Sequence, residues 1–167
     1  MDRTGVITFK GNGLTLQGNP VKAGDKAPDF TALDNGLGAV SLKDLAGKKK
    51  IISVTPSLDT AVCDMQLRKF NEAAAQLGSD VAVVNISMDL PFAIGRFCST
   101  AGIDKVKTLS DHRDASFGLA YGVLIKELRL LTRSIFVIDE HDTVTYAEIV
   151  PEVTSHPDYD KALAAAK

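Results

Sequence analysis

The residues best suited to carry out a reaction are the only two cysteines of the chain, Cys63 and Cys98. In a reducing compartment, two cysteines are most often buried thiols with no chemical role. A cysteine becomes a nucleophile only where its surroundings favour the thiolate over the thiol. The neighbourhood of each cysteine therefore decides between a structural and a catalytic interpretation.

Cys63 ends the stretch Pro56-Ser57-Leu58-Asp59-Thr60-Ala61-Val62-Cys63, which leaves an apolar strand and enters a predicted helix. A helix N-terminus offers unpaired N–H groups and a partial positive charge, and both stabilise a thiolate. The Thr60 hydroxyl can cap this helix and also bond to a substrate oxygen. Pro56 restricts the loop and has no N–H that would compete for the thiolate. The spacing indicates an activated cysteine.

Two observations weigh against that interpretation. Cys63 continues the apolar stripe of its own helix, as a core cysteine would. The carboxylate of Asp64 follows it directly and opposes ionisation of the thiol, although neighbouring side chains on a helix do not face each other. The three histidines, His112, His141 and His156, fall in predicted loops without the spacing of metal ligands. We therefore expect no metal and no other cofactor.

Alternating strands and helices must position these side chains. Apolar runs predict strands at 51–54, 81–86, 107–109, 134–139 and 143–150, and periodic patterns predict helices at 60–77, 89–102, 115–120 and 158–166. Gly78 is expected to end the first helix, and Gly102 the second. Asp89 is expected to cap the second helix, with Pro91 in its first turn.

The N-terminal segment predicts a β-hairpin over residues 6–16, turning at Gly11-Asn12-Gly13. A short strand follows Phe30, a capped turn covers 41–45, and the lysines at 48–50 are predicted to form a solvated loop. This order of elements predicts a thioredoxin-like α/β fold with an N-terminal β-hairpin extension. We expect one domain over residues 1–167, with residues 1–20 forming the extension.

Composition narrows the class of protein. The chain has 167 residues, is 45% hydrophobic and carries a net charge of −2, which favours a globular domain and gives no indication of a nucleic-acid or membrane partner. No apolar run approaches the ~18 residues that a membrane span needs. The first residues lack the apolar core of a secretory signal. We expect a cytoplasmic protein, and export as an already trimmed mature form is also compatible with the sequence.

Three segments carry a resemblance to a known family. Pro56, Thr60 and Cys63 match the motif P-x-x-x-T-x-x-C of the peroxiredoxins, and Gly24, Ala27, Pro28 and Phe30 match their G-x-x-A-P-x-F segment. The stretch Pro56–Cys63, together with Gly95-Arg96-Phe97-Cys98, resembles more narrowly the bacterial thiol peroxidases, the atypical two-cysteine branch. The resemblance covers essentially the whole chain. Ala61 departs from it, because many members have proline there.

The resemblance implies roles for two further residues. Arg133, just before the strand 134–139, matches the arginine that stabilises the reacting oxygens, and guanidinium suits that role because its donors form a rigid fork. From the residues alone, Arg68 or Arg129 could compete for it. Cys98 matches the resolving cysteine. It continues the apolar stripe of its helix and should point inward, so the helix must partly unwind before the two sulfurs can meet.

The implied reaction is reduction of a hydroperoxide. Cys63 would become a sulfenic acid, Cys98 would convert it to an intramolecular disulfide, and thioredoxin would reduce the disulfide. The resemblance also implies a homodimer and a preference for organic hydroperoxides. Two alternatives stay open at this point. A thiol–disulfide oxidoreductase is disfavoured by the absence of C-x-x-C, and a redox-inert binding module would tolerate loss of Cys63.

Overall fold

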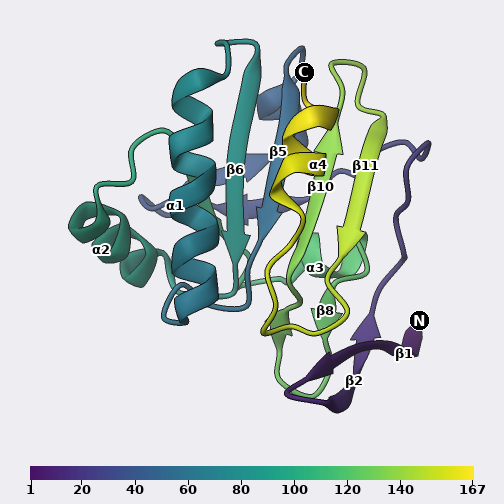
Figure 1. The fold of residues 1–167 in the computed structure, drawn as a ribbon. Coiled ribbons are helices and arrows are strands. Elements are labelled where there is room, and N and C mark those ends of the chain that lie inside the picture. Colours follow the sequence, from purple (N-terminus) through teal and green to yellow (C-terminus); the bar gives the residue numbers. More distant parts are fainter.

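A seven-stranded sheet forms the centre of the computed structural model, which describes residues 1–167 (Figure 1). Its strand order is β11-β10-β5-β6-β7-β3-β4, and among neighbouring strands only the pairs β5–β6 and β6–β7 are parallel. The strands are β3 (Thr31–Leu33), β4 (Ala39–Ser41), β5 (Lys49–Val54), β6 (Val81–Ser87), β7 (Lys107–Ser110), β10 (Ser134–Ile138) and β11 (Val144–Ile149). The helices are α1 (Ala61–Gln76), α2 (Pro91–Ala101), α3 (Ser116–Ala120) and α4 (Tyr159–Ala165), and a short 3-10 turn, η1, covers Leu42–Leu45.

Both faces of this sheet are covered, because successive side chains of a strand point to opposite sides. Ile51 packs in one apolar cluster with residues of α1, α2 and α4, whereas Ile52 packs in the other cluster with residues of α3. Figure 1 shows α1 and α4 in front of the sheet, with α2 beyond α1 at the left-hand side. Strands covered on both faces read as continuous apolar runs, which is why they could be predicted.

A second, four-stranded sheet holds the N-terminal hairpin. Its order is β1-β2-β8-β9, formed by β1 (Asp2–Phe9), β2 (Asn12–Gln17), β8 (Leu124–Ile125) and β9 (Leu130–Leu131). The predicted hairpin is confirmed, but the residues with positive φ in its turn are Lys10 (φ 50°) and Gly11 (φ 83°), and Gly13 is not among them. The strands β4, β8 and β9 were not predicted, because two or three residues carry too little pattern.

Three local predictions are wrong. Gly78 does not adopt the left-handed conformation of a helix cap, and α1 ends at Gln76 with Leu77 extended. Asp89 does not cap α2, whose N-cap residue is Leu90 and has no side-chain cap bond, although Pro91 does begin the helix. Gly102 does end α2, as predicted, with a φ of 71° that favours glycine.

Lys50 is the third correction. Its side chain is fully buried in β5 instead of lying in a solvated loop. The ammonium group forms an ion pair with the carboxylate of Asp142, in the turn between β10 and β11. A buried charge needs such a partner, because leaving water without one costs several kcal/mol, on the order of a whole domain's net stability.

The helices are all shorter or more polar than a membrane span requires, so none of them could cross a bilayer.

Candidate active site

The N-terminus of α1 lies where β5 ends, at the carboxyl edge of the parallel strands. Thr60 is the N-cap residue of α1, as predicted, with extended backbone angles. Its hydroxyl does not cap the helix, however, and instead donates to the carbonyl oxygen of Ser57 at 3.1 Å. The Thr60 amide donates to the same carbonyl at 3.3 Å. The loop before Cys63 is therefore closed by two hydrogen bonds onto one acceptor.

Cys63 occupies the first turn of α1 and is a free thiol with no exposed surface. The carboxylate of Asp64, which the sequence presents as a cost to a thiolate, forms an ion pair with Arg68 one turn further along the helix. This pairing offsets the negative charge nearest to Cys63 in the sequence.

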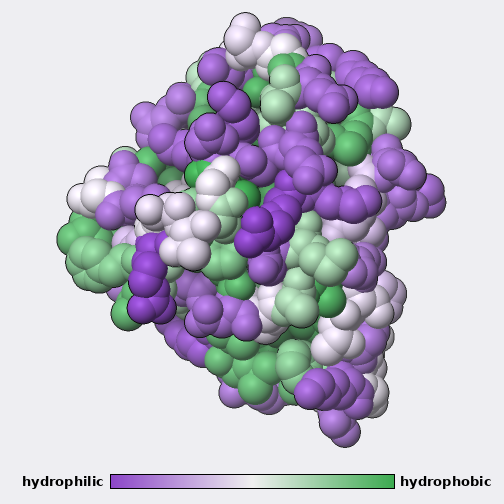
Figure 2. Space-filling view, turned by 60° about the vertical axis from the view of Figure 1, so that its left-hand side comes forward, coloured by the Kyte–Doolittle hydropathy of each residue, from purple (hydrophilic) through white to green (hydrophobic).

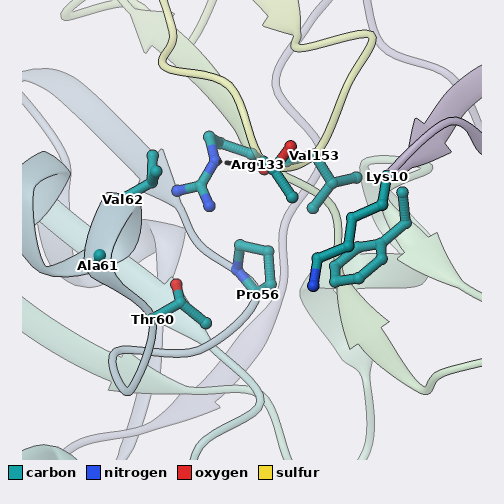
Figure 3. A pocket seen from close by; sticks show the side chains of 9 residues that line it. Lys10, Pro56, Thr60, Ala61, Val62, Arg133 and Val153 are labelled. Carbon is teal, nitrogen blue, oxygen red and sulfur yellow. Dashed lines mark hydrogen bonds between the residues drawn. The ribbon is translucent and has the colours of Figure 1, made fainter.

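A cavity of about 420 Å³ opens beside this turn. Its lining consists of Phe9, Lys10, Pro56, Thr60, Ala61, Val62, Arg133, Val153 and Thr154. Figure 3 shows Pro56, Thr60 and Arg133 around one opening, with Lys10 of the hairpin on the opposite side. Three predicted site residues thus meet at one cavity. Cys63 itself does not line the cavity, although its neighbours Ala61 and Val62 do.

Two hydrogen bonds hold the Arg133 guanidinium, which is almost fully buried. Its Nε donates to the carbonyl oxygen of Val153 at 2.8 Å, and its Nη1 donates to Oε1 of Gln66 at 2.9 Å. The Nη2 group has no protein partner and remains free for a ligand oxygen. The structure places the competing arginines elsewhere: Arg68 pairs with Asp64 at the surface, and Arg129 is exposed in the turn between β8 and β9.

Gln66 is a site residue that the sequence reasoning missed. It is fully buried on α1, and its Nε2 donates to Oγ of Ser53 at 2.7 Å while its Oε1 receives Arg133. It lies one turn beyond Cys63, on the face that packs against β5. A buried polar residue at an apolar position of a helix is the only sequence signal that could have indicated this role.

The N-terminal hairpin is also part of the site. The backbone of Thr8 receives a hydrogen bond from Val153 N at 2.9 Å, and Thr8 N donates to Pro151 O at 2.7 Å. The Glu152 carboxylate accepts from Thr8 Oγ1 and Gly11 N, both at 2.9 Å. These bonds fix the segment whose carbonyl at Val153 holds Arg133. On the face drawn in Figure 2, hydrophobic residues gather in the lower half, at the height of the hairpin in Figure 1.

Cys98 lies on α2, packed against the apolar cluster that also contains residues of α1. Its sulfur is half-buried, not fully inward, and is 3.8 Å from Thr108 Oγ1. Burial raises the pKa of the Cys98 thiol above its usual value. It lines a second cavity of about 370 Å³, formed by Asp34, Asn35, Gly36, Cys98, Ile103, Asp104, Val106, Lys107 and Thr108. This cavity shares no lining residue with the cavity beside the Cys63 turn.

No three His, Cys, Asp or Glu side chains gather in the structure in a way that would hold a metal ion.

Known proteins resemble this chain over nearly its full length. A family model described as Redoxin matches residues 22–163. The thiol peroxidases of Halalkalibacterium halodurans and Bacillus subtilis are each 63% identical over 161 residues, which cover 96% of both chains. Among solved structures, a peroxiredoxin-like protein from Aquifex aeolicus superposes with a TM-score of 0.90 and is 38% identical, covering 98% of this chain and 95% of that one.

This likeness confirms the predicted thioredoxin-like α/β fold, since the match in structure extends over the sheet, the helices and the hairpin. The motif residues Pro56, Thr60 and Cys63 lie together at one helix start, as in the resemblance noted from the sequence. The chain belongs to the Redoxin family and, within it, to the bacterial thiol peroxidases of the peroxiredoxin type.

Proposed function

We propose that this thiol-dependent peroxidase reduces hydrogen peroxide and organic hydroperoxides through Cys63, with Cys98 as the resolving cysteine and thioredoxin as the reductant. Membership of the thiol peroxidases carries the coarser part, a peroxide substrate and a thiol reductant. The observation that carries the finer part is the clamped Arg133, which lines a cavity beside the Cys63 turn and whose Nη2 has no protein partner.

In the first step, the Cys63 thiolate attacks one peroxide oxygen and the O–O bond breaks. The sulfur is oxidised to a sulfenic acid, and the leaving oxygen takes a proton to depart as water or an alcohol. Arg133 and the backbone N–H groups of the first turn of α1 donate to the oxygens that gain negative charge. The Thr60 hydroxyl can accept from or donate to the peroxide, since it needs only to rotate away from the Ser57 carbonyl.

The cavity supports organic substrates. Its volume of about 420 Å³ exceeds what hydrogen peroxide needs, and Phe9, Val62 and Val153 give it apolar walls. Apolar surface of this kind favours the alkyl or aryl group of a hydroperoxide by removing it from water. Hydrogen peroxide would gain nothing from these walls and would depend on Arg133, Thr60 and the backbone N–H groups of α1.

In the second step, Cys98 would attack the sulfenic sulfur and release water, leaving an intramolecular disulfide. Because Cys63 is fully buried on α1 and Cys98 lies on α2 beside a separate cavity, we expect α2 to open first. Its last residue is held to α1 by Arg68 Nη1, which donates to Ala101 O at 3.3 Å, and the loop that follows is held by Asn71 Oδ1, which accepts from Lys105 N at 2.8 Å. These exposed bonds are the ones we expect to break.

The resemblance supports three further parts of the proposal: a homodimer, thioredoxin as the dithiol reductant, and a cytoplasmic location. A reducing compartment suits the cycle, because the disulfide must be reopened after every turnover. Sedimentation analysis of the reduced and oxidised protein would test the dimer.

The proposal is tested by peroxide-dependent NADPH oxidation in the presence of thioredoxin and thioredoxin reductase. The wild type should turn over cumene hydroperoxide and hydrogen peroxide, and both Cys63→Ser and Cys98→Ser should be inactive in this coupled assay. Full activity of Cys63→Ser would refute the assignment of the nucleophile. Full activity of Cys98→Ser would show that an external thiol resolves the sulfenic acid.

A further inference from the structure

Asp89 connects the loop that precedes Cys63 to the start of the Cys98 helix. Its Oδ1 accepts from Ser57 Oγ at 2.8 Å, and its Oδ2 accepts from Leu58 N at 2.8 Å. It lies between the end of β6 and the first residue of α2, so the carboxylate that holds one cysteine's loop belongs to the other cysteine's segment. Asp89, which the sequence predicted as the cap of α2, thus binds a distant segment of the chain instead.

Further bonds fix Asp89 itself. Its Oδ2 also accepts from Ser87 Oγ at 2.9 Å, and its carbonyl oxygen accepts from Ser110 Oγ at 2.5 Å. Ser87 and Ser110 lie at the ends of β6 and β7 and are almost fully buried. The carboxylate is therefore anchored to the rigid edge of the central sheet, and it holds the Ser57-Leu58 segment in place from there.

The chain of bonds continues to the reactive turn. Ser57 O is the acceptor for both the hydroxyl and the amide of Thr60. Leu58 is buried in the same apolar cluster as Ile94 of α2, so packing joins the two segments at the point where Asp89 bonds them. Displacing Ser57 would move Thr60, whose side chain lines the substrate cavity.

We propose that Asp89 is a positioning residue for the peroxide reaction: through Ser57 it holds Thr60 at the cavity, and it resists opening of the Cys63 loop away from α2. This inference rests on the proposed roles of Cys63 and Cys98. Loss of the carboxylate bonds should slow oxidation of Cys63, because the loop samples other conformations. The same loss should leave disulfide formation unchanged or faster, because that step needs the two segments to separate.

Asp89→Asn and Asp89→Ala test this, with Asp59→Asn as the matched control. Asp59 lies in the same loop and lines the same small pocket as Asp89, but its exposed carboxylate makes no hydrogen bond or ion pair, so the control removes the same charge without breaking a contact. Ser57→Ala removes the hydrogen bond from Ser57 Oγ to Asp89, and it replaces the Asp89 variants in the test if one of them fails to fold.

The two rates are measured separately by rapid quench, alkylation and mass spectrometry, since the chain has no tryptophan to report them by fluorescence. We expect Cys63 oxidation by cumene hydroperoxide to slow about tenfold in Asp89→Ala, because loss of one hydrogen bond to a charged group can account for a change of that size. The rate should fall less in Asp89→Asn and Ser57→Ala. Disulfide formation should be unchanged or faster in the same variants.

Unchanged or faster Cys63 oxidation would overturn the proposal. So would a parallel fall in both rates, which indicates general destabilisation, or an equal loss in Asp59→Asn. Absence of any Cys63–Cys98 disulfide in the oxidised wild type would instead refute the proposed role of Cys98, while the Cys63 oxidation rates would still decide the role of Asp89.

Discussion

Arg133 Nη1 donates a 2.9 Å hydrogen bond to Gln66 Oε1, and both residues are buried. Gln66 is in turn fixed by its 2.7 Å bond to Ser53 Oγ, so α1 and β5 together hold one side of the guanidinium in place. Because α1 also carries Cys63, one helix bears both the proposed nucleophile and a partner of the guanidinium.

Replacing Gln66 should therefore impair the peroxide step without touching either cysteine. Gln66→Met keeps the length of the side chain and removes its bond to Arg133, and we expect kcat/KM for cumene hydroperoxide to fall about tenfold, the equivalent of about 1.4 kcal/mol. The control is Gln76→Met, an exposed position on the same helix. Equal kinetics in the two variants would contradict the role of Gln66.

A change in α2 should act on the second step. A methyl group added at Gly95 would meet only Asn35 at 3.9 Å, an ordinary contact, so alanine fits there and should stabilise α2 by about 1 kcal/mol. Gly95→Ala should slow disulfide formation about fivefold and increase inactivation by excess peroxide. Ala93→Gly, an exposed position of the same helix, should do the opposite. Equal rates in both variants would show that opening of α2 does not limit resolution.

The hairpin should contribute to substrate choice. Phe9 lines the cavity, and partial loss of its apolar contact costs about 1 kcal/mol, or about fivefold in binding. Phe9→Ala should lower kcat/KM for cumene hydroperoxide by about this factor and leave the value for hydrogen peroxide unchanged. Phe92→Ala, at a position 70% exposed on α2, is the control. An equal loss with both substrates would assign Phe9 a purely structural role.

Stability should depend on pH through Asp111. Its buried carboxylate accepts from Phe117 N and Gly118 N at the start of α3, yet burial raises its pKa to about 6. The folded chain thus binds this proton more tightly than the unfolded chain. Protonated Asp111 therefore contributes to stability at low pH, and this contribution is lost as the pH rises through about 6.

When the pH is lowered from 7 to 4.5, protonation of Asp111 should raise the protein's free energy of unfolding by about 2 kcal/mol. Guanidinium unfolding of the wild type and Asp111→Asn at both values isolates the effect, because the variant cannot titrate there. A difference between the two proteins that stays constant with pH would contradict the prediction.

Much of the fold could be predicted from the sequence, because buried strands such as Val81–Ser87 are recognisable as apolar runs. The Cys63 turn was equally readable, since its motif is local. What could not be read were contacts between distant residues. The partner of buried Lys50 is Asp142, 92 positions away, and the acceptors that clamp Arg133 are 20 and 67 positions away.

Asp89 shows why local rules also fail. Asp followed closely by Pro is a good start signal for a helix, and the helix does begin at Pro91. The side chain instead accepts hydrogen bonds from Ser57 Oγ and Leu58 N, which lie 32 and 31 positions earlier in the chain. Only the folded arrangement of β6, β7 and the Cys63 loop makes that choice visible.

The most direct test of the account is the intact mass of the reduced protein after one equivalent of cumene hydroperoxide. The wild type should lose about 2 Da, the two hydrogens removed on forming a disulfide, and peptide mapping should join Cys63 to Cys98. Cys98→Ser should gain about 16 Da, one oxygen on Cys63, and in a parallel sample dimedone should trap this sulfenic acid with loss of water. Cys63→Ser should be unchanged. Rapid oxidation of Cys98 in Cys63→Ser, or a wild type that keeps both thiols, would contradict the account.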